Sequence, residues 1–443
     1  MPSRRISPKS YLPLPNTTQN GENYSASTYG NLSINQYIAR VDHKINDANQ
    51  LAMHFIYEYR RFPNHTANPN FGTIGTYPMF NVALQYLHTF SASMVNELLL
   101  GYDFEHVKQL STRTNTDFTA ASIGINGFVQ PNGEPWPPSE QGFPILGISG
   151  ALSLGDTSSA SNIDDSRTYQ FIDNFSWTRG QHTLIFGGEV RHLQDNATTN
   201  NTPWGSITFN GVQTGNAFAD FILGVPSSLI TPEGVPLTMA RQWRDSVYVQ
   251  DNWKATSNLT INLGLRWDLW VPPHDNLDTS RTLDFSTQTP TLVSLPDPLW
   301  HVSHLNFGPR VGFAYSFPHQ FVVRSAYGVT WYGGKFDNIN ILQLNPPSDP
   351  SFSLTNGSTP TNPPTATIEN PVSPSIKPAS ANVTSLPADD THRNLYVQTW
   401  NFTLSKQFGS NIVDVSYVGS KGTHQDTSIP YFNTGPPQRR ASR

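Results

Sequence analysis

Residues 259–269 read LTINLGLRWDL, and apolar and polar side chains alternate along this stretch. The odd positions carry Leu, Ile or Trp, whereas the even positions carry Thr, Asn, Gly, Arg and Asp. Successive side chains of a β-strand point to opposite faces, so a period of two gives the strand one apolar and one polar face. The stretch therefore predicts a strand that lies between an apolar and an aqueous environment.

The same alternation recurs along the chain and predicts twelve strands in all. With 259–270 they are 37–43, 49–60, 80–90, 95–104, 168–177, 182–191, 243–253, 309–317, 320–332, 396–407 and 411–419. The connections between these strands are short and long in turn. The short ones fall near 45–48, 91–94, 179–181, 254–258, 318–319 and 408–410, and the long ones cover about 61–79, 105–167, 192–242, 271–308 and 333–395.

This rhythm of connections separates two classes of β protein. A transmembrane barrel has short turns on the periplasmic side and long loops on the extracellular side. A soluble sandwich or propeller has turns of mixed length and no reason to alternate them. The sequence therefore predicts an all-β fold, an antiparallel transmembrane β-barrel with long extracellular loops and short periplasmic turns.

Aromatic residues stand at both ends of the predicted strands. Those before short turns are Phe90, Trp177, Trp253 and Phe317, and those before long connections are Tyr57, Tyr59, Trp267, Trp270, Trp331 and Tyr332. Aromatic girdles at the two membrane interfaces predict this placement, although aromatic residues also favour strands in general.

Three polar residues have the parity of the apolar face, namely His88, Asp173 and Asp251. They lie near short turns, where even a charged lipid-facing residue costs only about 0–1 kcal/mol.

Composition excludes several other classes of protein. The 443-residue chain has 31 Gly and 36 Pro, which argue against a helical fold, and we identify no helical segment in it. Its formal net charge of −5 offers no basic face for nucleic acid. The absence of cysteine excludes disulfides and thiolate metal sites. No run approaches the roughly 20 apolar residues of a transmembrane helix.

Residues with possible catalytic or metal-binding chemistry do not form a convincing site in the sequence. Asp164 and Asp165 have no partner at catalytic spacing, and His301 and His304 have no acidic residue close by. Residues 419–423, GSKGT, lack the spacing of a phosphate-binding loop, so we interpret them as a strand-to-loop turn. We therefore predict no enzyme activity, no cofactor and no metal site.

The charged residues of the polar faces are the candidates for function. In a wide barrel they line the lumen and contact a plug, water or substrate, whereas a purely structural role would be cross-strand pairing that fixes packing and register. The long connections, especially 105–167 and 333–395, form the other candidate contact surface. The lumen-facing candidates are Arg40, Asp42, Glu58, Arg60, Glu189, Arg191, Arg266, Asp268 and Arg324.

Eight stretches, in order along the chain, resemble one known family. They are 37–43 (YIARVDH), 96–98 (NEL), 173–184 (DNFSWTRGQHTL), 218–226 (FADFILGVP), 248–254 (YVQDNWK), 259–267 (LTINLGLRW), 309–315 (PRVGFAY) and 415–424 (VSYVGSKGTH). Together they resemble the Oar-like TonB-dependent outer-membrane transporters, which are abundant in Acidobacteria. The resemblance implies a barrel in the outer membrane of a Gram-negative-type bacterium. It also implies that the energised TonB complex tugs a plug domain and so moves a ligand, here unidentified, through the barrel.

The family comparison also predicts what part of such a transporter this sequence covers. Complete members of the family have a regulatory-like N-terminal domain, a plug and a barrel of 22 strands, of which we expect twelve here. We divide the chain into a loop-like leader at 1–36 without signal peptide or plug, a partial barrel at 37–424, and a polar tail at 425–443. With its edge strands exposed, we expect this chain to aggregate when expressed alone. A heat-modifiable, detergent-stable monomer would contradict that expectation.

Two other interpretations remain open at this point. A secreted soluble β-rich adhesin or glycan-binding protein would use the abundant Trp, Tyr and Asn for sugar stacking. The strict alternation of short and long connections favours the barrel over this class. A smaller self-contained barrel of twelve strands is also compatible with the strand count. The partners we expect are outer-membrane lipid, a plug domain, the TonB complex and an unknown ligand, with no nucleic acid.

Overall fold

The computed structural model describes most of the strands and part of the connections, and the statements below refer to these residues. They are 11–18, 21–28, 30–113, 120–126, 128, 134, 142–151, 153–156, 161–198, 204–231, 237–284, 291–295, 298–334, 336–345, 353–356, 366–369 and 393–425. Much of the leader and the tail, and most of residues 346–392, therefore lie outside the described residues.

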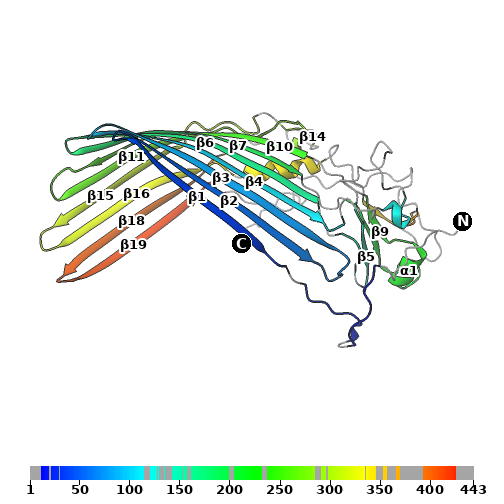
Figure 1. The fold of residues 1–443 in the computed structure, drawn as a ribbon. Coiled ribbons are helices and arrows are strands. Elements are labelled where there is room, and N and C mark those ends of the chain that lie inside the picture. The colour runs from blue at the N-terminus through cyan, green and yellow to red at the C-terminus, as the bar shows by residue number, and fades with distance from the viewer. Residues whose placement is uncertain are drawn as a thin grey trace, which may run out of the picture.

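All twelve predicted strands form one large sheet, in which each strand pairs with the next one along the chain (Figure 1). Every pairing in this row is antiparallel, which confirms the predicted fold class. In spatial order the strands are β1 (Ser33–Asn46), β2 (Asn49–His65), β3 (Gly72–Ser91), β4 (Met94–Ser111), β6 (Ser161–Arg179), β7 (His182–Thr198), β10 (Leu237–Trp253), β11 (Leu259–Trp270), β15 (Phe307–Phe317), β16 (Phe321–Tyr332), β18 (Leu395–Phe408) and β19 (Asn411–Thr423).

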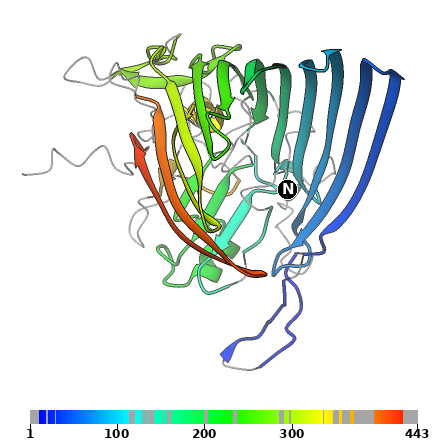
Figure 2. The same ribbon diagram turned by 90° about the vertical axis from the view of Figure 1, so that its left-hand side faces the viewer.

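The sheet curves into a trough whose two edges are β1 and β19 (Figure 2). The short turns gather at one end of the strands, and the long connections leave from the other (Figure 1). Every second side chain of a strand belongs to the apolar face, and in the isolated protein these side chains remain exposed. Val247 on that face is 55% exposed and Phe171 is 45% exposed. This surface is what a lipid bilayer would cover.

One predicted long connection is wrong. Residues 61–79 form paired strand over most of their length, since β2 and β3 continue as far as His65 opposite Gly72. Only residues 66–71 connect the two strands. Pro63, Gly75 and Pro78 interrupt the alternation in this region, so the pattern disappears although the cross-strand hydrogen bonds continue.

The connections also contain helices that the sequence did not predict. Helix α1 (Ala217–Leu223) begins after Asn216, whose side chain accepts a hydrogen bond from the amide of Ala219 at 3.0 Å. It ends at Gly224, which has a φ of 69°. The connections also contain two short 3-10 helices, η3 (Ala121–Ile123) and η5 (Phe336–Leu344). Segments this short do not show a helical period in the sequence. None of the helices within the described ranges is long and apolar enough to cross a membrane.

A small layer at the long-connection end holds the main hydrophobic core. It contains α1 and a four-stranded sheet in the order β17 (Ser353–Thr355), β9 (Ser228–Ile230), β8 (Ser206–Phe209) and β5 (Ile145–Ile148). The pairing of β5 with β8 is parallel, the exception to the antiparallel pattern among the described pairings. Phe143, Leu146, Ile207 and Phe209 are fully buried here. We call this layer the cap.

Candidate functional site

The polar faces of the strands lie on the concave side of the sheet. Asn340 of η5 donates a hydrogen bond to Asp195, which has polar-face parity on β7. Helix η5 lies inside the curve of the sheet (Figure 2). Polar side chains of neighbouring strands therefore share one concave surface, and the residues that could contact a molecule inside the trough are found there.

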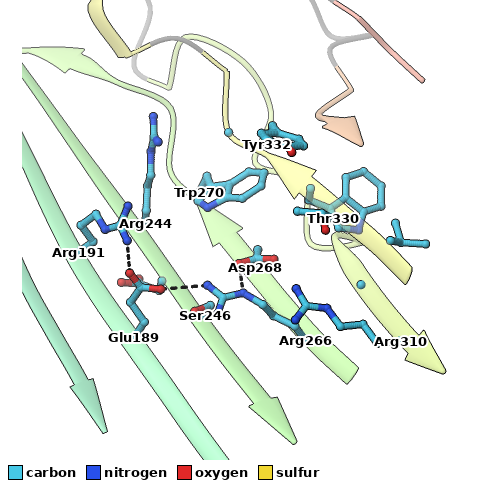
Figure 3. A pocket seen from close by; sticks show the side chains of 15 residues that line it. Glu189, Arg191, Arg244, Ser246, Arg266, Asp268, Trp270, Arg310, Thr330 and Tyr332 are labelled. Atoms are coloured by element: carbon cyan, nitrogen blue, oxygen red, sulfur yellow. Dashed lines mark hydrogen bonds and ion pairs between the residues drawn. The ribbon is translucent and has the colours of Figure 1, made fainter. Parts of the chain in front are cut away.

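Four of the nine predicted residues come together in one cavity of about 310 Å³ on this surface (Figure 3). Glu189 and Arg191 come from β7, and Arg266 and Asp268 come from β11. The register explains their approach, because Ser246 of β10 pairs with Glu189 on one side and with Asp268 on the other. The two carboxylates thus lie in one row, two strands apart, with room for an arginine between them.

Glu189 is the centre of this cluster. Its carboxylate accepts hydrogen bonds from Gln170 Nε2 at 2.6 Å, from Arg266 Nη2 at 3.0 Å and from Arg191. Arg266 also donates from Nε to Asp268 Oδ1 at 2.9 Å. The side chain of Glu189 is only 12% exposed. A carboxylate this buried needs its partners, so Glu189, its three donors and Asp268 form one interdependent unit.

Two arginines that the prediction omitted, Arg244 and Arg310, line the same cavity. Both have the polar-face parity of their own strand, as the other candidates do, a signal that the sequence did contain. Arg244 donates to Gln242 Oε1 at 2.9 Å and to the carbonyl of Gly334 at 3.4 Å. In the described part of the chain, neither arginine makes an ion pair within 4.0 Å. Their charge is available to an anionic group in the cavity.

Trp270 and Tyr332 also line this cavity (Figure 3). Their assignment to an aromatic girdle facing lipid is therefore wrong. Both residues lie at the last position of their strand with polar-face parity, which directs them to the concave side. With Trp331, which also lines it, the cavity has three aromatic side chains beside its four arginines.

A chain of polar contacts connects the cavity to strands farther along the sheet. The ring of Tyr248 lies over Gly187 of β7, and its hydroxyl donates to Asn174 of β6. Asn174 donates to Glu97 Oε2 at 3.1 Å, and Gln85 donates to Glu97 Oε1 at 2.5 Å. Because the Arg266 guanidinium lies 5.4 Å from the centre of the Tyr248 ring, the contacts continue from β3 to β11.

The other five predicted residues lie outside the cavity. Arg40 and Asp42 pair with each other at 2.7 Å on β1, and both are more than half exposed. Arg60 pairs with Glu58 on β2, and Glu58 also accepts from Gln36 Nε2 at 2.8 Å. Arg324 on β16 makes a long contact of 3.5 Å to Ser405 Oγ. These contacts are the cross-strand and same-strand pairs of a structural role.

The concave face changes character beyond β11. A second depression, of about 510 Å³, is lined by four small residues, Gly264, Gly312, Ala326 and Gly328. Its other lining residues are mostly polar, namely Gln250, Asn252, Asn262, Arg310, Thr330, Thr399 and Asn401, with Leu263, Val311 and Tyr327. Small residues leave the backbone open to close approach by another chain or ligand. We call this surface the smooth wall.

Two carboxylates of the long connections, outside the membrane-spanning strands, hold these connections to the sheet. Burial would raise the pKa of Asp275, but hydrogen bonds from the amides of Met239, Leu277 and Ser280 and from the Ser280 hydroxyl outweigh it and lower that pKa. Burial raises the pKa of Asp156, which accepts hydrogen bonds from Ser111 and from the amide of Phe143 at 3.0 Å. The two carboxylates thus respond to pH in opposite directions.

Asp164, Asp165 and residues 419–423 have defined neighbours in the structure. Within the described ranges no group of three or more His, Asp or Glu residues is arranged to hold a metal ion. Asp165 pairs with His106 at 2.5 Å, and Asp164 accepts from Ser166 Oγ at 3.2 Å. Residues 419–423 are not a turn, since β19 continues through Thr423 with the Trp400 ring against Gly419.

Comparison with known proteins gives a family and a set of similar folds. A family model described as "Outer membrane beta barrel domain" matches residues 3–443. No curated protein sequence matches the chain. Among solved structures, the outer membrane transporter YddB from Escherichia coli is 11% identical, with a TM-score of 0.52 over 90% of this chain and 41% of its own.

Two other similar structures are also described as transporters. The copper transporter OprC is 11% identical, with a TM-score of 0.46 over 88% of this chain and 45% of its own. The FrpB iron transporter from Neisseria meningitidis is 12% identical, with a TM-score of 0.45 over 88% of this chain and 44% of its own. The chain thus spans less than half the length of each of these three structures.

Proposed function

Because this chain belongs to the outer membrane β-barrel domain family and so is a protein of the outer membrane, we propose that it is the barrel part of an Oar-like TonB-dependent transporter. The observation that carries the proposal is the concave face, where a charged cavity adjoins the smooth wall. The cluster around Glu189 holds this face together, and Arg244 and Arg310 beside it carry charge that no ion pair in the described residues takes up. Its similarity in fold to the transporter YddB supports the same function.

In this proposal the two concave surfaces have different tasks. The cavity around Glu189 takes part in holding an anionic ligand, because Arg244 and Arg310 offer charge that no ion pair in the described residues takes up. The smooth wall receives the plug domain, whose main chain can approach Gly264 and Gly312 closely. The TonB complex would act on that plug, and the range 37–424 would be the barrel portion. We assign the chain no catalytic activity.

Family membership weighs against the alternative of a secreted soluble adhesin or glycan-binding protein, since the family is one of outer-membrane barrels. The ligand, whether siderophore, glycan, peptide or exported protein, is not specified by the arginines alone. They restrict it to molecules with a negatively charged group.

Site-specific photo-crosslinking in the native host tests the proposal. A photoreactive phenylalanine analogue would replace Asn262, on the floor of the trough, or its neighbour Leu263, which is 45% exposed on the apolar face. We expect position 262 to crosslink to protein in a pattern that changes when TonB is deleted, and position 263 to crosslink to lipid in both hosts. Identical patterns at 262 with and without TonB would contradict the TonB-dependent function. Recovery of the protein in the soluble fraction would contradict the membrane location.

A further inference from the structure

A row of aromatic rings lies on the apolar face of the sheet, toward the long-connection end of β4, β6, β7 and β10. The ring centres of Tyr102 and Tyr169 are 4.9 Å apart, and those of Tyr169 and His192 are 6.3 Å apart. His192 and Trp243 stack with centres 4.2 Å apart and planes only 7° from parallel. Tyr169 is 44% exposed and Trp243 is 43% exposed, so the rings form a continuous open shelf.

Two arginines stand one step beyond this shelf, on the side away from the short turns. Arg167 pairs with Gln194, and Gln194 pairs with Arg241, so the three residues form one cross-strand row. The next row of the same face toward the short turns contains Tyr169, His192 and Trp243. Neighbouring strands are about 4.8 Å apart, so the backbones of the two arginines are separated by about 10 Å with an amide side chain between them.

The charge of these arginines is only partly compensated, because Asp195 and Asp275 attract Arg241 from a distance without forming an ion pair within 4.0 Å. Arg241 donates to Asn196 Oδ1 at 2.9 Å and to the carbonyl of Ala240 at 2.7 Å, and no carboxylate in the described residues forms an ion pair with it. Arg167 is 3.7 Å from Asp165, but that carboxylate also pairs with His106 at 2.5 Å. His274 pairs with Arg241 and lies beside it. This patch therefore attracts an anion.

The surface on the other side of the shelf is apolar apart from Asp245 of β10, which pairs with Val190. Phe171, Val190 and Val247 lie there on β6, β7 and β10, and each is between 44% and 55% exposed. Along the strands, the outer face thus changes from hydrocarbon-like side chains to aromatic rings and then to cations. A lipid with a phosphorylated headgroup has the matching order of acyl chain, polar linkage and negative charge.

From this order we propose that the outer face of β6, β7 and β10 binds a phosphorylated lipid of the outer leaflet. A phosphate group lies between Arg167 and Arg241, where each guanidinium can donate two hydrogen bonds and Gln194 can add a third partner. The sugar or glycerol linkage rests on the His192–Trp243 stack, and an acyl chain follows Phe171 and Val247. The inference rests on the orientation in the proposed function, in which the long connections face outward.

Native mass spectrometry of the protein extracted in mild detergent from the outer membrane of its host tests this site. We expect the wild-type protein to retain a phosphorylated lipid and, after delipidation, to rebind bisphosphorylated lipid A in preference to the same lipid without phosphates. The double variant Arg167→Gln/Arg241→Gln should retain about tenfold less. Arg179→Gln is the matched control, because Arg179 is on the same strand and has the same parity, at the opposite end. It should retain as much lipid as the wild type.

Three results would overturn the site. They are unchanged lipid retention in the double variant, equal binding of the dephosphorylated lipid, and binding of inorganic phosphate alone without lipid. Should the double variant fail to reach the outer membrane, the single variant Arg241→Lys replaces it. That variant keeps the charge but loses the paired donors, so we expect an intermediate loss, and full retention would contradict the proposal. Crosslinking at position 262 reports on the transport function separately, so failure of one proposal does not imply failure of the other.

Discussion

Apart from the edge strand β1, which has 14 residues, the sheet has two walls whose strands differ in length. One consists of β2, β3, β4, β6, β7 and β10, which are 17 to 20 residues long, and we call it the long-strand wall. The other consists of β11, β15, β16, β18 and β19, which are 11 to 14 residues long. A tilted strand needs about 9–11 residues to cross a membrane. The short strands thus match the bilayer, whereas the long strands project beyond it and hold the cap.

The concave faces of the two walls differ in the same way. The long-strand wall and the adjoining β11 contain the buried Glu189 cluster and the polar contacts from Gln85 to Arg266. The short strands contribute the smooth wall of Gly and Ala. The difference indicates that charged pairs fix the shape of one wall, whereas the other is kept free for a chain that packs on it. Each prediction below tests this contrast.

The largest effect is expected from Glu189→Leu. The change leaves Arg191 and Arg266 without their shared carboxylate, and the loss of one partner from a buried pair is strongly destabilising. Because these arginines are about a third exposed, we expect a loss of about 2–3 kcal/mol in the free energy of unfolding. Urea unfolding of the protein extracted from the outer membrane, monitored by tryptophan fluorescence, measures it.

The matched control is Arg324→Leu in the short strands. Arg324 contacts Ser405 at 3.5 Å, so its removal should change stability by less than about 0.5 kcal/mol. Equal losses in the two variants would show that charge pairing does not distinguish the walls.

Gly187→Ala should have the next largest effect. A Cβ at this position would overlap the ring of Tyr248, which must then move away from Asn174. We expect a loss of about 1–2 kcal/mol, the usual cost of an added methyl group without space. Hydrogen exchange of β6 and β7 amides would show whether the loss is local.

Two glycines serve as controls for Gly187. At Gly188 the nearest atom to a new Cβ is the carbonyl oxygen of Ser246 at 3.5 Å, and at Gly264 it is Arg310 Cβ at 3.6 Å. Alanine fits at both, so their stability should stay within about 0.5 kcal/mol of wild type. A loss of stability at Gly264 as large as at Gly187 would mean that the smooth wall has no room for an added methyl group.

The strands were predictable because lipid imposes a strict demand on the sequence. Residues 259–270 form β11 with the predicted bounds, since every second side chain there must face the bilayer. Outside the bilayer that demand ends, so the extensions of β2 and β3 carry no alternation and were missed. Helix α1 was missed because seven residues are too few for a helical period.

The alternation of side chains along each strand predicts which face of the sheet carries the candidate site, but not which residues meet there. Parity placed Glu189, Arg191, Arg266 and Asp268 on the polar face, but their meeting depends on Ser246 pairing with residues of two different strands. Register between strands so far apart in sequence cannot be read from one chain. The same parity also applies to Arg40 and Arg324, which lie elsewhere. Parity therefore selects a face of the sheet, and register selects the site on it.

Asp275→Asn should weaken the attachment of a long connection to β10. Because hydrogen bonds lower the pKa of Asp275 in the folded protein, its ionised form stabilises the fold at neutral pH. This contribution is present above the ordinary Asp pKa of about 4 and is lost as the pH falls through the lower folded value. We expect the variant to lose about 1 kcal/mol at pH 7.

Thermal unfolding of both proteins between pH 7 and pH 2, followed by circular dichroism, measures this difference. The gap between wild type and Asp275→Asn should shrink at the lowest pH, where the wild-type carboxyl is protonated as well. A gap that is constant with pH would mean that the carboxylate charge has no part in holding the connection.

The smallest effect is expected at Asp156, and it has the opposite sign. Burial raises the pKa of this carboxyl, so the folded cap binds a proton more tightly than the unfolded chain does. Stability from this group is therefore greatest at low pH and is lost as the pH rises through the raised folded value. Asp156→Asn removes the buried charge and retains an acceptor for the amide of Phe143 and a donor for Ser111, so we expect a gain of up to about 1 kcal/mol in the free energy of unfolding at pH 7.

Limited proteolysis of the cap at pH 7 and pH 5, in the wild type and in Asp156→Asn, tests this prediction. The wild-type cap should be more resistant at pH 5 and the variant equally resistant at both, whereas a variant that is cleaved faster at pH 7 would mean that the ionised carboxylate holds the cap on the long-strand wall.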